Sequence, residues 1–220
     1  MNYLFIYYNK MNIQIKYRNS DNLISLNVDS FNDIKNKENI IYLDCHDNNL
    51  ITLKRIENLT KLQKLNCYCN KLTSLNCIEN LTELQELYCH NNRLTSLKGI
   101  ENLTELQEFY CSDNLITSLK EIKNLTSLKI LGCEQNQLTT IKEIVNLNSL
   151  KMLYCNNNQL TTLKGIENLS ELQELHYNNN QLMYIWKYII NIREYIKRYK
   201  YKNKIYKLLN FQKIIKLIKL

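Results

Sequence analysis

A single pattern of apolar positions recurs along most of the chain at a spacing of 22 residues. The unit that starts at Leu62 can be written LxxLxCxxNxLxxLxxIxNLxx, and every marked position returns 22 residues later, from Leu84 onward. Further units start at Leu106, Leu128 and Leu150, an earlier unit starts at Ile40, and a seventh starts at Leu172. A fixed period of this length is the signature of a solenoid, in which each unit packs only on its neighbours. We therefore predict seven stacked units over residues 40–182.

The alternation inside each unit predicts a β-strand that leads into a crossover. Leu65 and Cys67 alternate with polar or aromatic neighbours, and a period of two is typical of a half-buried strand. Parallel strands need a dozen or more residues to reconnect, and a 22-residue unit provides them. A column of asparagines follows the strands where the chain turns inward, and we expect each amide to bond backbone groups of its own and adjacent units. The column consists of Asn48, Asn70, Asn92, Asn114, Asn136, Asn158 and Asn180.

These residues give the segment a family resemblance. It resembles a leucine-rich repeat of the short 22-residue class that also occurs in bacterial internalins. The cysteine in the third core position is similar to that of leucine-rich repeats in giant-virus and protist proteins of unassigned function. The resemblance covers about two thirds of the chain. It implies an α/β fold, namely a right-handed leucine-rich-repeat solenoid with a parallel sheet on the concave side and short helical or 3₁₀ turns on the convex side.

The two ends of a solenoid expose its core and need caps. In residues 1–39, which we assign to an N-terminal cap, Ile13, Ile15 and Tyr17 alternate with polar residues, and a polar turn at 19–22 leads into a second apolar stretch. This pattern predicts a β-hairpin. In residues 183–220, apolar side chains recur at gaps of three and four, which predicts a helical cap over the other end.

The positive charge of the chain is concentrated in this last segment. The whole chain has a net charge of +8, yet residues 187–220 alone carry eleven Lys and Arg against one acid, whereas residues 40–182 have a net charge of −3. Lysine-rich amphipathic helices also bind nucleic acid or anionic membrane surfaces. A binding role of the tail therefore stays open beside its role as a cap.

The cysteines raise the question of disulfide or metal chemistry. Six of the eight recur at the 22-residue spacing and point into the predicted core, where a straight row of thiols cannot surround zinc tetrahedrally. We expect them to pack as small apolar side chains, and Cys69 and Cys77, outside the column, to be free thiols. With no signal peptide and no apolar run long enough to span a membrane, we expect an intracellular protein with reduced thiols. The column consists of Cys45, Cys67, Cys89, Cys111, Cys133 and Cys155.

No catalytic constellation is recognisable. His46 and His90 lie two units apart, roughly 10 Å at the usual strand spacing, too far to share a metal ion. His176 lies in another column of the predicted concave face, and the chain has only three glycines, with no phosphate-binding loop. We expect a protein that is not an enzyme and that takes no cofactor, metal or small-molecule substrate.

The surface that varies from unit to unit is the concave face. Its outward strand positions form an aromatic and apolar stripe flanked by glutamates, and aromatic residues dominate many protein interfaces. We expect this face to bind a polypeptide with a basic or mixed segment, and the protein to be a monomer. A simpler alternative, that tyrosine merely suits exposed strand positions, stays open. The predicted binding residues are Tyr68, Glu86, Tyr88, His90, Glu108, Tyr110, Glu134, Met152 and Tyr154.

Overall fold

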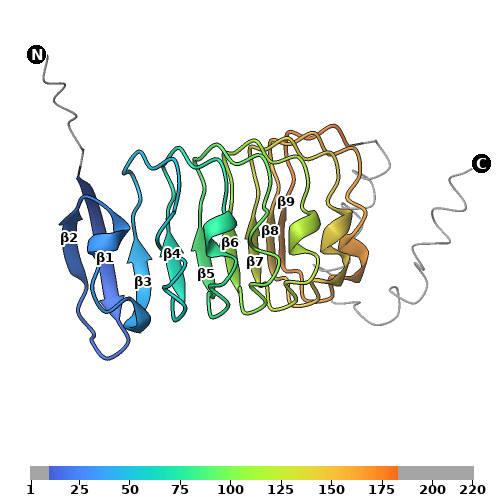
Figure 1. Cartoon of the computed structure of the whole chain (residues 1–220). Helices are drawn as coiled ribbons and strands as arrows, with labels where there is room; N and C mark the ends of the chain where they lie inside the picture. Colours follow the sequence, from blue (N-terminus) through green and yellow to red (C-terminus); the bar gives the residue numbers. More distant parts are fainter. Residues whose placement is uncertain (1–9, 183–220) are drawn as a thin grey trace, which may run out of the picture.

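In the computed structural model, residues 10–182 are described, and they fold around one nine-stranded sheet (Figure 1). The strand order is β2-β1-β3-β4-β5-β6-β7-β8-β9, so from β3 onward the order in space follows the order in the chain. The strands are β1 (Met11–Tyr17), β2 (Ile24–Val28), β3 (Ile40–Asp44), β4 (Lys64–Asn66), β5 (Glu86–Tyr88), β6 (Glu108–Tyr110), β7 (Ile130–Gly132), β8 (Met152–Tyr154) and β9 (Glu174–His176).

Strands β3 to β9 are parallel and pair in the register that the sequence period requires. Lys64 pairs with Glu86, and Glu86 with Glu108, each 22 residues further on. Seven parallel strands are therefore joined by six complete crossovers, which confirms the predicted solenoid. Because equivalent positions of successive units stand side by side, each column of the repeat becomes a row on the molecular surface or in the core.

Four of the six crossovers contain a short 3₁₀ helix, and residues 10–182 hold no α-helix. The expected α/β class is therefore corrected to a parallel β-solenoid. The reason lies in the apolar spacing, because Leu75, Ile78 and Leu81 recur every three residues, which is the 3₁₀ period. Ile78 N donates to Leu75 O at 3.0 Å, and Leu81 N to Ile78 O at 3.0 Å. The short turns are η1 (Phe31–Asp33), η2 (Lys37–Asn39), η3 (Asn76–Ile78), η4 (Lys120–Ile122), η5 (Lys142–Asn146) and η6 (Ile166–Asn168).

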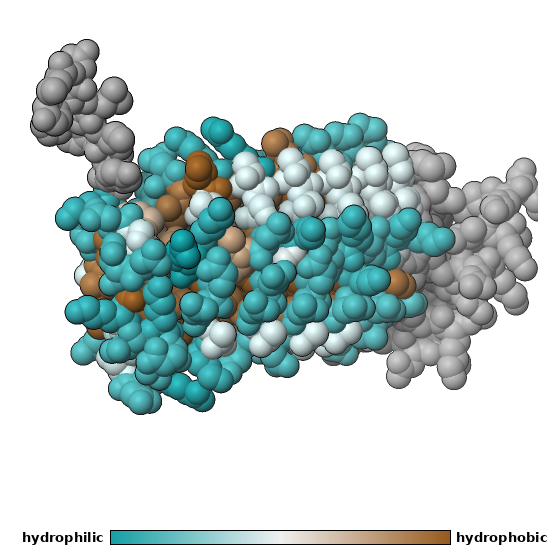
Figure 2. Space-filling view, in the orientation of Figure 1, coloured by the Kyte–Doolittle hydropathy of each residue, from teal (hydrophilic) through white to brown (hydrophobic). Residues whose placement is uncertain are grey.

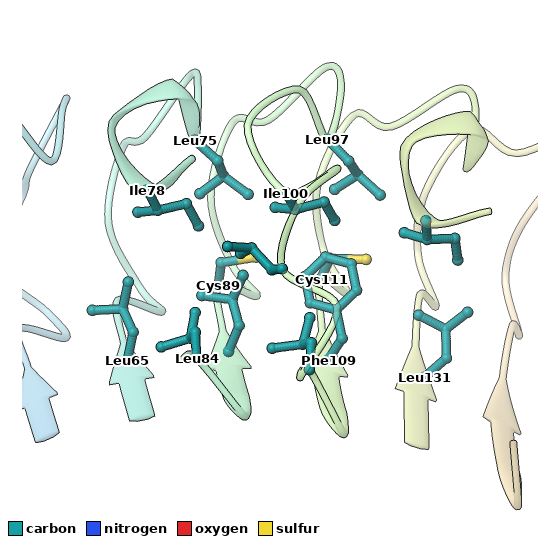
Figure 3. Packing of buried hydrophobic residues seen from close by; sticks show 14 of the residues in the cluster. Leu65, Leu75, Ile78, Leu84, Cys89, Leu97, Ile100, Phe109, Cys111 and Leu131 are labelled. Atoms are coloured by element: carbon teal, nitrogen blue, oxygen red, sulfur yellow. The ribbon is translucent and has the colours of Figure 1, made fainter. Parts of the chain in front are cut away.

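A continuous apolar core fills the space between the sheet and the crossovers. Figure 3 shows Leu75 and Leu97 in the same place of successive units, with Ile78 and Ile100 beside them in the same relation. All four side chains are fully buried. Phe109 takes the strand position that leucine holds in the neighbouring units, and it is also fully buried. Each unit therefore completes its core only against its neighbours, as the repeat pattern predicts.

The asparagine column forms the predicted ladder of buried amides. Asn114 Nδ2 donates to the carbonyls of Cys89 at 3.1 Å and Cys111 at 3.0 Å, and Asn114 Oδ1 accepts from Leu94 N at 2.9 Å. The same contacts recur at Asn136, whose Oδ1 accepts from Ile116 N at 2.9 Å. Each amide thus forms hydrogen bonds with backbone groups of two adjacent units. These backbone groups lie beyond the strands and would otherwise be buried without partners.

The cysteine column is part of the core, as predicted. All six of its thiols are free and fully buried. Burial raises the pKa of each, and for Cys155 to about 12. Cys69 is exposed and Cys77 is half-buried, and both are free, in agreement with the expectation. The column therefore acts as a row of small apolar side chains.

The N-terminal edge of the solenoid is covered by the predicted β-hairpin. Strands β1 and β2 pair in antiparallel fashion, and β1 also pairs antiparallel with β3. Ile13 and Ile15 are each 1% exposed, because they cover the open end of the core. The predicted helical cap falls on residues 183–220, which lie outside the described residues.

The face of the molecule drawn in Figure 2 is mostly hydrophilic. Figure 2 shows it crossed by regular rows of residues of intermediate hydropathy, as expected when the polar positions repeat with each unit. Within residues 10–182, the structure contains no helix with the length and apolar character that a membrane crossing requires.

Candidate functional site: the concave face of the sheet

The outward side chains of the parallel strands form three columns on one face of the sheet. The first column carries the residues that open each strand, the second those that end it, and the third those two positions further on. The register of the strands places Glu86, Tyr88, Glu108, Tyr110, Met152 and Tyr154 in the first two columns, and Tyr68, His90 and Glu134 follow two residues after their strands. The first column in β4 to β9 consists of Lys64, Glu86, Glu108, Ile130, Met152 and Glu174.

Tyr88 lies at the centre of the largest contact cluster among the predicted residues. Its ring stacks on that of Tyr110, with centroids 5.2 Å apart and planes within 8°. Its hydroxyl donates to Glu108 Oε2 at 2.7 Å and lies 3.0 Å from Glu86 Oε2. Burial, together with these two carboxylates, raises the pKa of Tyr88, so that the hydroxyl remains a donor. The ammonium of Lys64 lies 4.9 Å from the Tyr88 ring centroid and 2.6 Å from Glu86 Oε2.

A second stack runs along the third column. The Tyr68 ring lies between the imidazoles of His46 and His90, with centroid distances of 4.7 and 4.6 Å and nearly parallel planes. Burial lowers the pKa of His90, although the carboxylates of Asp113 and Glu134 act in the opposite direction. The structure therefore brings the predicted Tyr68 and His90 together and adds His46, which was not among the predicted binding residues.

A buried hydrogen-bond network at β3 and β4 was not predicted from the sequence. Asp44 ends strand β3 on the outward side of the sheet, but it is only 8% exposed. Its Oδ1 lies 2.6 Å from His46 Nδ1, and its Oδ2 accepts from the Tyr42 hydroxyl at 3.0 Å and from Asn66 Nδ2 at 3.1 Å. Burial acts to raise the pKa of Asp44, but these donors hold it below its ordinary value. The Asp44 carboxylate is therefore satisfied internally, whereas Asn66 Oδ1 is buried without a hydrogen-bond partner among residues 10–182.

The C-terminal half of the face has fewer internal partners. Glu134 accepts from the Ser112 hydroxyl, and the Tyr154 hydroxyl donates to Glu174 Oε2 at 3.1 Å. The same hydroxyl lies 3.4 Å from Met152 Sδ, so the predicted Met152 and Tyr154 are in contact.

Gly132 explains how Tyr110 is seated in this half. A Cβ on Gly132 would come within 2.6 Å of the Tyr110 ring and 3.3 Å of Glu134 Oε2. The Tyr110 side chain therefore covers the backbone of β7, next to the Glu134 carboxylate. A larger residue at position 132 would displace this ring from the face.

Two recesses lie where the hairpin meets the first parallel strands. One, of about 400 Å³, is lined by Gln14, Ser25, Asp44 and His46 among others. The other, of about 510 Å³, borders Lys16, Leu23 and Lys64 among others, and Leu23 is 54% exposed. Neither recess includes the cluster around Tyr110 and Tyr154. Within residues 10–182, no group of three or more His, Cys, Asp or Glu side chains is placed to hold a metal ion.

The missed residues share one signal with the predicted ones. His46, Asp44 and Glu174 occupy the same 22-residue columns as Tyr68, Tyr88 and Glu86, so the period alone was sufficient to place them on this face. The period does not predict the orientation of each aromatic side chain, and this orientation determines which columns are in contact.

Comparison with known proteins agrees with this architecture. The family model "Leucine Rich repeats (2 copies)" matches residues 82–124, 104–147 and 126–170. The solved structure of an internalin from Listeria monocytogenes is similar at a TM-score of 0.60 and 29% identity, covering 61% of this chain and 39% of that one. A leucine-rich-repeat protein from Leptospira interrogans is similar at a TM-score of 0.55 and 41% identity, covering 58% of this chain and 34% of that one.

A further internalin, internalin C2 from Listeria monocytogenes, shares the fold at a TM-score of 0.54 and 24% identity, covering 67% of this chain and 75% of that one. The chain thus spans less than half the length of the first internalin and of the Leptospira protein. No curated protein matches the sequence.

Residues 82–170 therefore match the leucine-rich-repeat family model, and the fold is similar to that of solved leucine-rich-repeat proteins. More particularly, its repeats resemble those of the internalin type, as the sequence pattern indicated. The leucine-rich-repeat fold is generally a scaffold for protein–protein interaction, and such scaffolds are typically not enzymes.

Proposed function

We propose that the concave face binds a polypeptide partner that presents a basic or mixed-charge segment. The residues proposed to contact this partner are Tyr68, Glu86, Tyr88, His90, Glu108, Tyr110, Glu134, Met152 and Tyr154.

The observation that carries this proposal is that two carboxylates of the concave face are hydrogen-bonded but not paired with a cation. Glu108 and Glu134 accept hydrogen bonds from the hydroxyls of Tyr88 and Ser112, and within residues 10–182 neither forms an ion pair. A hydroxyl fixes the position of a carboxylate without neutralising its charge. The face therefore presents fixed negative charge, and complementary charge on a partner would steer association and set its orientation.

The aromatic side chains supply the apolar part of such an interface. Tyr88, Tyr110 and Tyr154 are half-buried, and each presents a rigid ring with a polar tip. Stacking between Tyr88 and Tyr110 restricts both rings before any partner arrives, so binding would order few additional side chains. This property favours a binding surface over a merely solvated strand face.

Replacing Tyr88 and Tyr110 together by alanine tests the proposal. We expect the amount of the specific partner that co-purifies from the native cell to fall by at least tenfold. Aromatic side chains at binding hot spots typically contribute about 2 kcal/mol or more to the free energy of binding. The matched control is the pair Thr95→Ala and Thr117→Ala, whose side chains are exposed on another surface. Equal recovery of partners by the tyrosine variant and the control, with both folded by circular dichroism, would show that the face is not the binding surface.

The proposal also covers the location, the oligomeric state and the domain organisation of the protein. We place it inside the cell as a monomer, with a cap at residues 1–39, the solenoid at 40–182 and a basic segment at 183–220. It needs no small-molecule substrate. The basic segment lies outside the described residues. A partner can bind the concave face whether or not this segment binds nucleic acid or a membrane.

A further inference from the structure

The concave face over β6 to β9 has an arrangement that the N-terminal half lacks. Four neighbouring strands place Glu108, Ile130, Met152 and Glu174 side by side in the first column, in unbroken register. Two apolar side chains therefore lie between two acids along the axis of the solenoid. In the N-terminal half the corresponding positions are Tyr42, Lys64 and Glu86, of which Tyr42 donates to Asp44 and Lys64 pairs with Glu86.

The two outer acids of this row are held in place by tyrosines. The Tyr88 hydroxyl donates to Glu108 at 2.7 Å, and the Tyr154 hydroxyl donates to Glu174 at 3.1 Å. Glu174 also lies 3.9 Å from His176 Nε2. Within residues 10–182, no lysine or arginine pairs with either carboxylate.

The middle of the row offers an apolar surface of moderate size. Ile130 and Met152 are half-buried, and the Tyr154 hydroxyl touches Met152 Sδ at 3.4 Å. On the neighbouring column, Tyr110 covers Gly132, so its ring borders the same area. A partly exposed isoleucine and methionine between two tyrosines suit an aliphatic side chain of a partner.

The spacing of the row matches that of an extended peptide. Neighbouring strands lie about 4.8 Å apart, so Glu108 and Glu174 stand roughly 14 Å apart, with the apolar pair at the midpoint. In an extended chain, side chains on one side recur every two residues, and residues i and i+4 are therefore separated by roughly 13.5 Å.

From this match we infer that the row over β6 to β9 binds an extended peptide segment that crosses the strands. The segment carries a basic residue at position i, an aliphatic residue at i+2 and a second basic residue at i+4. The basic side chains contact Glu108 and Glu174, and the aliphatic side chain rests on Ile130 and Met152. Glu134, on the far side of Gly132, adds negative charge beside the centre. The inference rests on the proposed function and gives the chemistry of the partner at that site.

The test uses the full chain and two fluorescein-labelled serine-rich peptides of identical composition. One peptide has lysine at positions two and six and leucine at position four, and the other has its two lysines adjacent. Fluorescence anisotropy is expected to show at least fivefold tighter binding of the spaced peptide. Glu108→Gln and Glu174→Gln should each weaken its binding by about threefold, the size expected for an exposed ion pair. Glu105→Gln, an exposed acid outside the row, removes the same charge and should leave the binding unchanged.

The glutamine variants keep an acceptor for the tyrosine hydroxyls, so thermal unfolding should confirm that they remain folded. Equal binding of the two peptides, equal effects of all three glutamine variants, or no binding of either peptide would overturn the inference. Any of these results could still accompany loss of the cellular partner on replacing Tyr88 and Tyr110. In that case the concave face would bind its partner through a different sequence, and only the peptide chemistry would be wrong.

Discussion

Replacing Asn114 by alanine is expected to lower the free energy of unfolding by about 3 kcal/mol, because the change leaves a buried donor without a partner. Asn114 Oδ1 accepts from Leu94 N at 2.9 Å, and that N–H has no other acceptor among the described contacts. The carbonyls of Cys89 and Cys111 each lose the hydrogen bond from Asn114. Each keeps a second one, from Asn92 and Asn136 respectively. The cost is therefore dominated by the orphaned N–H and two lost bonds.

Urea unfolding followed by circular dichroism measures this change. The matched control is Asn124→Ala, because Asn124 recurs just as regularly but its side chain is exposed. We expect the control to remain within about 0.5 kcal/mol of the parent, as surface substitutions usually do. A loss of the same size in both variants would show that the ladder contributes nothing specific to the stability of the solenoid.

Raising the pH above 9 is expected to unfold the protein, because the thiols of the cysteine column ionise only in the unfolded chain. Burial raises the pKa of all six thiols above their ordinary value of 9.0, for Cys155 to about 12. Below pH 9 both states hold these protons, and the stabilisation is fully present. Between pH 9 and 12 the unfolded chain binds fewer protons than the folded one, so the free energy of unfolding falls as the pH rises.

The expected slope is steep because the thiols act together. Each contributes up to about 1.4 kcal/mol per pH unit, so six together contribute about 8 kcal/mol per unit once the unfolded thiols are ionised. Urea unfolding at several values of pH between 7 and 10.5 gives the slope. Cys111→Ala should reduce it by one proton, and replacing the exposed Cys69 by alanine should leave it unchanged. A free energy of unfolding that stays constant to pH 10.5 would contradict the description of the column as buried neutral thiols.

The architecture was predictable because every constraint on it recurs in the sequence. The 22-residue period fixed the parallel register, and the alternation around Leu65 and Cys67 fixed which side chains enter the core. The hairpin at β1 and β2 followed from alternating apolar residues on either side of a polar turn. These are local patterns with large energetic consequences, since a shift by one residue would expose the whole apolar column.

The details of the concave face were less predictable. The burial of Asp44 depends on three donors, Tyr42, His46 and Asn66, that converge on one carboxylate. Such convergence is decided by side-chain rotamers, which a column of residue types does not specify. Of the short helical or 3₁₀ turns that the family resemblance implied, only the 3₁₀ form appears in residues 10–182, because apolar positions three residues apart favour it.

The central claim is that the concave face is the surface that binds a partner. Its most direct test is to place a photo-crosslinking amino acid at Asn156, on the concave face, or at Asn102, on the exposed crossover side, and to irradiate the native cell. The account predicts a discrete crosslinked partner from position 156 and none from position 102. A partner crosslinked from position 102 alone would contradict it.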